Sequence, residues 1–190
     1  LVPLSGGLAV LFGTLGGSMF FIFLRSFYHT EAKLILNDRA LSLLFASIIS
    51  ILIITLVGFI DDLLIQKSKN SSMGLKQWQK PLLTLAAAVP LMVVNAGTTT
   101  MIVPFFDRVN FGIFYPLLLV PLGVVVASNM VNMLGGFNGM ESGMALIYLT
   151  SLGLYAYRHG RYIAALIALM TLASVFAFYF YNKYPAKIFP

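Results

Sequence analysis

The 190 residues are 59% hydrophobic and only 9% charged. Soluble domains are about 45–50% apolar and about 25% charged, so this chain has too few polar side chains to cover a water-facing surface. The composition excludes a soluble enzyme, a disordered tail and a collagen-like fibre, and it indicates an integral membrane protein. Since the chain has no cysteine, disulfides, thiolate chemistry and zinc–sulfur sites are excluded as well.

The basic residues outnumber the acidic ones by 12 to 6, which gives a formal net charge of +6. In a soluble protein such an excess can indicate nucleic-acid binding. Here the basic residues lie in short loops between apolar segments, so we expect a membrane and no nucleic acid as the partner. The two faces carry equal numbers of basic residues, and charge bias alone therefore gives no orientation. The single most basic loop is the one after the second segment, and the positive-inside rule favours a cytoplasmic position for it. Its basic residues are Lys67, Lys69, Lys76 and Lys80.

A helix that crosses a bilayer needs about 20 predominantly apolar residues. Six segments approach or reach this length, so we predict an all-α fold: a polytopic membrane helix bundle in a single domain. Because successive spans alternate in direction, the loop after the second segment, the loop after the fourth and both chain ends share one face. The predicted spans are residues 6–24, 40–60, 81–96, 112–128, 140–157 and 162–181.

Three charged residues flank the second and third apolar segments on that shared face. Asp61 and Asp62 end the second segment, and ionisable groups at membrane depth are costly and usually functional. On a helix these two side chains point about 100° apart, so one could face a metal or substrate while the other orients a base. Lys80 begins the third segment and could contact a diphosphate as a point charge. The alternative is a solvated helix end with a headgroup anchor.

A second polar stretch begins at the end of the fourth segment, on the same face. Asn129 and Asn132 are three residues apart, so in a helix they point the same way. Gly136 and Gly139 allow backbone amides to approach a ligand closely, and the start of the next helix favours an anion. These groups form a candidate cradle for a phosphate and a metal. A glycine-rich turn with capping asparagines is the alternative.

Together these stretches resemble the polyprenyl-phosphate N-acetylhexosamine-1-phosphate transferases, of glycosyltransferase family 4 type. The family's Pro-x-x-x-Gly element is similar to residues 3–7, its paired-aspartate motif matches residues 58–62, and its long asparagine–glycine motif matches residues 129–143. Residues 97–104 and the sequence Gly-Gly-Phe-Asn-Gly at 135–139 resemble the eukaryotic and archaeal dolichyl-phosphate GlcNAc-1-phosphate transferase branch. The likeness covers almost the whole chain.

The resemblance implies a Mg²⁺-dependent enzyme of ten helices, of which this chain would be the middle six. Such an enzyme transfers GlcNAc-1-phosphate from UDP-GlcNAc to polyprenyl or dolichyl phosphate and releases UMP, in the first membrane step of lipid-linked glycan synthesis. The implied location is the plasma membrane of a prokaryote or the endoplasmic reticulum, with the active site on the cytoplasmic face. The resemblance is also compatible with a homodimer. The alternatives are a transporter or channel that couples ions through Asp61 and Asp62, and a non-catalytic assembly subunit.

The resemblance also implies roles for individual residues. Asp61 would accept a proton from the lipid phosphate or orient it, and Asp62 would hold the metal shell or Lys80, which contacts the diphosphate. Asn132 would be a ligand of Mg²⁺, or of Mn²⁺ in its place, and a further aspartate ligand is expected beyond Pro190. The substrate-binding residues would be Asn129, Gly136, Asn138, Gly139 and Glu141. Gly136 and Asn138 would border the uracil, and Asn129 and Glu141 would fix the loop that contains them.

Overall fold

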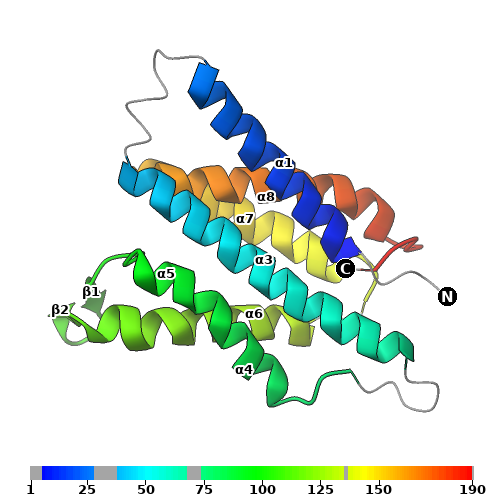
Figure 1. Cartoon of the computed structure of the whole chain (residues 1–190), viewed down its shortest axis with the longest axis horizontal. Helices are drawn as coiled ribbons and strands as arrows, with labels where there is room; N and C mark the ends of the chain where they lie inside the picture. The colour runs from blue at the N-terminus through cyan, green and yellow to red at the C-terminus, as the bar shows by residue number, and fades with distance from the viewer. Residues whose placement is uncertain (1–5, 28–37, 68–73, 135–136, 190) are drawn as a thin grey trace.

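The computed structural model is mostly helical (Figure 1). It describes residues 6–27, 38–67, 74–134 and 137–189, without the side chains of 66–67 and 132–134. Two of its helical elements are short and not α-helical: a 3-10 helix, η1 (Ala86–Ala88), and a π-helical turn, η2 (Tyr115–Leu119). The helices are α1 (Gly6–Phe27), α3 (Asp38–Lys67), α4 (Gln79–Leu85), η1 (Ala86–Ala88), α5 (Val89–Val93), η2 (Tyr115–Leu119), α6 (Val120–Leu134), α7 (Met140–Arg158) and α8 (Tyr162–Asn182).

Three of the described helices are long and apolar enough to cross a membrane. They are α1, α3 over Asp38–Ile65, and α8. Few of their large apolar side chains are buried and many are exposed, which is favourable where the bilayer offers an apolar solvent. The predicted class of helical membrane protein is therefore confirmed. The count of six spans and the ten-helix parent stay predictions.

Prolines interrupt the third and fourth predicted segments. Pro90 lies in the first turn of α5, directly after the 3-10 turn η1, and Pro116 lies in the first turn of η2. Proline removes a backbone donor and its ring clashes with the carbonyl four residues earlier, so a regular helix cannot run through it. This explains why both segments are built from short helical pieces.

A β-hairpin lies between these two interrupted segments, and the all-α prediction did not include it. Its strands are β1 (Thr100–Val103) and β2 (Asp107–Asn110), antiparallel, with Val103 opposite Asp107. The strand β1 is rich in β-branched Thr, Ile and Val, which favour extended backbone, whereas β2 has one valine. Four residues are too few to show in a search for 20-residue apolar runs, which is why the hairpin was missed.

The helix α3 lies between two groups of helices, with α1, α7 and α8 on one side and α4, α5 and α6 on the other (Figure 1). Small residues allow close packing within the first group. A Cβ at Gly13 of α1 would lie 2.6 Å from the Ser174 hydroxyl of α8, and one at Gly17 would lie 3.3 Å from Met170. Small residues at helix contacts are typical of membrane bundles, where lipid tails provide no hydrophobic drive for association. The two groups leave a space at the C-terminal end of α3.

Candidate functional site

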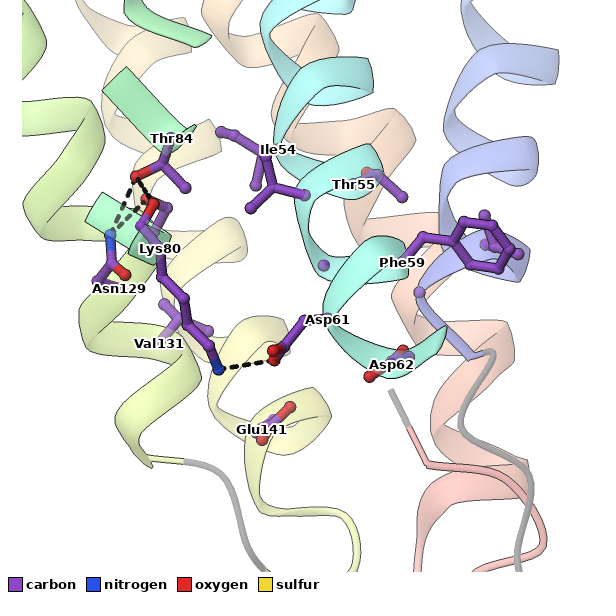
Figure 2. Close-up of a pocket in the computed structure, with 15 residues that line it drawn as sticks. Ile54, Thr55, Phe59, Asp61, Asp62, Lys80, Thr84, Asn129, Val131 and Glu141 are labelled. Atoms are coloured by element: carbon purple, nitrogen blue, oxygen red, sulfur yellow. Dashed lines mark hydrogen bonds and ion pairs between the residues drawn. The ribbon is translucent and has the colours of Figure 1, made fainter. Parts of the chain in front are cut away.

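A cavity of about 380 Å³ occupies the space at the C-terminal end of α3 (Figure 2). One part of its wall is apolar and comes from α1 and α3, with Leu8, Ile54 and Phe59 among the lining residues. The other part is polar and is contributed by α3, α4, α6 and α7. Its polar lining includes Asp61, Asp62, Lys80, Thr84, Asn129 and Glu141.

Asp61 has both carboxylate oxygens bound. The Lys80 ammonium lies 2.6 Å from Oδ2, and the Leu75 backbone N–H donates to Oδ1 at 2.6 Å. The Asp61 side chain is only 13% exposed and that of Lys80 26% exposed, so water screens this pair less than a surface pair. We expected Asp62 to hold Lys80 or a metal; in the structure the partner of Lys80 is Asp61.

Gly74 allows the loop before α4 to lie against the Asp61 carboxylate. A Cβ at this position would overlap Oδ1 of Asp61 and would lie 3.0 Å from the Ile65 side chain. Only a residue without a side chain therefore lets the next residue, Leu75, present its N–H to that oxygen. Gly74 was not among the site residues predicted from the sequence. The signal that could have found it is a lone glycine at the end of a polar loop, directly before a short helix.

Asp62 lines the same cavity but has a different environment. Among the described residues it makes no hydrogen bond and no ion pair within 4.0 Å. Figure 2 shows the Asp61 carboxylate facing the Lys80 ammonium, with Asp62 on the other side of Asp61. Consecutive helical side chains differ by about 100° in direction, so the two carboxylates do not share this partner. The carboxylate oxygens of Asp62 are therefore open to a ligand.

Asn129 connects α6 to α4. Its Nδ2 donates to the Thr84 hydroxyl at 3.1 Å and to the Val125 carbonyl at 2.8 Å. The buried Thr84 hydroxyl in turn donates to the Lys80 carbonyl at 3.0 Å. This chain of bonds fixes the backbone of Lys80, so Asn129 acts on the cavity both as a lining residue and through the position of α4. The sequence analysis did not single out Thr84.

Glu141 lies in the first turn of α7 and faces the cavity, half-buried (Figure 2). The start of α7 is held against the C-terminal segment by buried polar groups. The Ser142 hydroxyl donates to Asn182 Oδ1 at 2.6 Å, and Asn182 Nδ2 donates to the Ile188 carbonyl at 3.0 Å. Asn182 is 1% exposed, so this connection is shielded from water.

The remaining predicted site residues lie at the edge of the cavity or outside the described part of the chain. Asn138 is exposed, and neither Asn138 nor Gly139 lines the cavity. Gly139 begins α7 with a φ of 75°, a left-handed conformation that favours glycine, and a Cβ there would lie 3.2 Å from Lys183 Cα. Gly136 and the side chain of Asn132 lie outside the described residues.

The structure thus brings five predicted residues from four helices to one cavity. The ammonium group and the amide there can bind phosphate oxygens, the carboxylates can hold a cation between themselves and a phosphate, and the apolar wall is suited to a hydrocarbon chain. Within the described ranges no group of three or more His, Cys, Asp or Glu residues has the arrangement of a metal site. The five residues are Asp61, Asp62, Lys80, Asn129 and Glu141.

Comparison with known proteins shows the family to which the chain belongs. The model of glycosyl transferase family 4 matches residues 43–190. Two archaeal proteins named as UDP-N-acetylglucosamine–dolichyl-phosphate N-acetylglucosaminephosphotransferases match the whole chain: one of Saccharolobus solfataricus is 35% identical, and one of Sulfolobus acidocaldarius is 30% identical. A phospho-N-acetylmuramoyl-pentapeptide-transferase of Clostridium botulinum is 31% identical over 93% of the chain.

The chain spans 53% of the length of each of these three relatives. The match to the family model nevertheless covers most of the chain, including all the residues that line the polar part of the cavity. The chain therefore belongs to glycosyl transferase family 4.

Proposed function

We propose that the protein transfers GlcNAc-1-phosphate from UDP-GlcNAc to dolichyl phosphate or another polyprenyl phosphate and releases UMP. The observation that carries the proposal is the meeting of Asp61, Asp62, Lys80, Asn129 and Glu141 at one cavity at the end of a membrane helix. The names of the two archaeal relatives support this reaction for the dolichyl branch. The apolar wall beside the charged residues suits a substrate with a hydrocarbon chain and a phosphate headgroup.

The reaction forms one bond and breaks one. An oxygen of the lipid phosphate attacks the sugar-linked phosphorus of UDP-GlcNAc in line, and the bond from that phosphorus to the oxygen of UMP breaks. Such a transfer depends on positioning and on neutralising the phosphate charge more than on covalent help from the protein. Lys80 would supply positive charge to the diphosphate. Asp61 would hold the Lys80 ammonium in place, because both of its oxygens are already bound.

Asp62 would be the carboxylate that faces the reacting phosphates. The resemblance assigned the proton of the lipid phosphate to Asp61, but the bonds to Lys80 and Leu75 leave Asp61 little freedom for that role. The open oxygens of Asp62 can orient the lipid phosphate or take part in a metal shell. Glu141, on the far side of the cavity, would fix the loop that precedes α7.

The donor groups around the cavity suit Mg²⁺. They are all oxygen donors, the type that this hard cation prefers. Mg²⁺ is commonly held by one or two carboxylates with water and substrate phosphates in the rest of its shell, so a cluster of three acidic residues is not required. Asp62 would be one ligand, with Asn132 and an aspartate beyond Pro190 as the expected others. When bound, the ion supplies charge neutralisation at the diphosphate.

The site would open to the cytoplasm. The segment from the end of α3 to the first turn of α4 carries Lys67, Lys69, Lys76 and Lys80, and short basic segments between spans are retained on the cytoplasmic side. Asp61 and Asp62 lie in the last two turns of α3, at the same end of that helix. The proposed topology therefore places the UDP-sugar and the charged residues in one compartment.

The test is the release of UMP by the full-length protein from UDP-GlcNAc, polyprenyl phosphate and Mg²⁺, with the lipid-linked sugar phosphate measured in parallel. We expect Asp62→Asn to lower turnover by at least about 100-fold, the scale of an electrostatic group in a reaction site. The matched control is Asp107→Asn, a change of an exposed aspartate in the hairpin. Wild-type turnover in Asp62→Asn, or no UMP from the wild-type protein, would refute the proposal.

A further inference from the structure

The turn of the β-hairpin has an unexpected residue at its tip. The Phe106 N–H donates to the Val103 carbonyl at 3.1 Å and closes a four-residue turn. Pro104 follows Val103, and Phe105 has a φ of 74°. These are the features of a type II turn, in which the third position needs a positive φ and is normally Gly or Asn. A bulky residue in this conformation is a genuine outlier.

The tip is also exposed. Phe105 is fully exposed, and Phe106 and Ile102 are 76% and 74% exposed. The two strands contact chiefly each other, and no described helix covers the tip. The chain therefore keeps Phe105 in a conformation unfavourable for phenylalanine, without any contact inside the described structure that would compensate. A residue that breaks a local rule in this way indicates a function outside the fold itself.

The base of the hairpin is level with one end of the membrane-spanning helices. A cavity of about 650 Å³ is lined together by Arg39 and Leu43 at the start of α3, by Gly97 and Tyr115 on either side of the hairpin, and by Tyr162 at the start of α8. This is the end of α3 opposite to Asp61. Figure 1 shows the hairpin at the end of α5 and α6 that is far from α4.

We infer that the tip of the hairpin, Ile102 with Pro104–Phe106, inserts into the bilayer at the headgroup–acyl boundary on the face opposite to Asp61. Exposed apolar side chains also follow the hairpin along the chain, at Ile113 and Phe114 and at Leu117 of η2. Aromatic side chains are enriched at this depth of the membrane. The exposed Asp107 and Arg108 beside the tip would remain among the headgroups.

A nitroxide spin label tests the insertion directly. The 190 residues contain no cysteine, so Phe106→Cys can carry a single label in the full-length protein, in a background without other accessible cysteines, reconstituted in lipid nanodiscs. We expect collisions with oxygen, which concentrates in lipid, to exceed those with a water-soluble nickel chelate. The matched control is His159→Cys in the exposed turn before α8, at the same end of the bundle, where nickel collisions should dominate.

A second variant tests the role of Phe105. Asparagine tolerates the left-handed conformation but lacks the apolar ring, so Phe105→Asn should shift the label at Phe106 toward the nickel reagent while the turn is kept. A label at Phe106 that behaves like the one at His159 would overturn the inference. Protection from both reagents would overturn it too, since protein would then cover the tip. Neither label reports on sugar transfer, so a negative result leaves the proposed reaction standing.

Discussion

Replacing Gly74 by Ala should impair the site without touching any residue that contacts substrate. The new Cβ would overlap Oδ1 of Asp61 and crowd Ile65, so either the loop or the carboxylate has to move. The contact at risk is the 2.6 Å hydrogen bond from the Leu75 N–H to Asp61. A hydrogen bond to a charged group contributes about 1.5–3 kcal/mol. If all of it were lost from the transition state, kcat/KM would fall by roughly 10- to 150-fold, at about 1.36 kcal/mol per factor of ten.

We expect a fall in kcat/KM near the lower limit, about tenfold, because the loop can shift and water can replace part of the bond. UMP release by the full-length protein measures it. The control is Gly123→Ala in α6, where a Cβ would meet nothing within 4 Å. A loss of less than about twofold in Gly74→Ala would refute the idea that the loop positions Asp61.

A double-mutant cycle identifies the route of the effect. If Gly74 acts through the pair of Asp61 and Lys80, then Gly74→Ala should cost little more in a Lys80→Met background, where the pair is already broken. Additive losses would instead mean that the loop acts on the site by another path. Unchanged thermal unfolding of Gly74→Ala would show in addition that the loss is not one of overall stability.

Three further predictions follow from the same contacts. Lys80→Met should lower kcat/KM for UMP release by at least about 100-fold, and Lys80→Arg should recover only part of it because the guanidinium is planar and longer. Asn182→Leu should destabilise the protein by about 1–3 kcal/mol, since it leaves the Ser142 hydroxyl and the Ile188 carbonyl without their buried partner. A thermal unfolding series in detergent measures this loss, with a change of the exposed Asn110, Asn110→Leu, as control. Removing divalent cations with EDTA should abolish UMP release and added Mg²⁺ should restore it; full activity in EDTA would contradict the proposed role of Asp62.

The coarse arrangement of the molecule could be predicted because it follows from the properties of the bilayer. A chain with so few charges has to place its apolar segments in lipid, and each segment has to satisfy its own backbone as a helix. The alternation of spans then puts the aspartates and the stretch from Asn129 to Glu141 on the same face. The structure brings Asp61, Asp62, Asn129 and Glu141 to one cavity, as that reasoning requires.

The details that were missed depend on individual backbone positions. The partner of Lys80 depends on how residues 74–78 lead into α4, and Gly74 allows that segment to lie against Asp61 because it has no side chain. No periodicity reports such a contact. The hairpin was not predicted for a similar reason, since two strands of four residues produce no apolar run of helical length. Short elements are determined by turn chemistry, and the turn here breaks the usual preference by using Phe105.

The two neighbouring aspartates show how much local geometry adds to a sequence motif. Their chemistry is identical and they are neighbours in α3, yet the helical step turns their side chains in different directions and only Asp61 faces Lys80 of α4. One carboxylate therefore has a backbone N–H and an ammonium group bound, while the other has no described partner. Two identical side chains therefore have different surroundings, and the proposed roles differ accordingly. The helical step separates the two side chains, and Leu75 and Lys80 then bind Asp61 alone, so the environment of the pair depends on residues outside the pair itself.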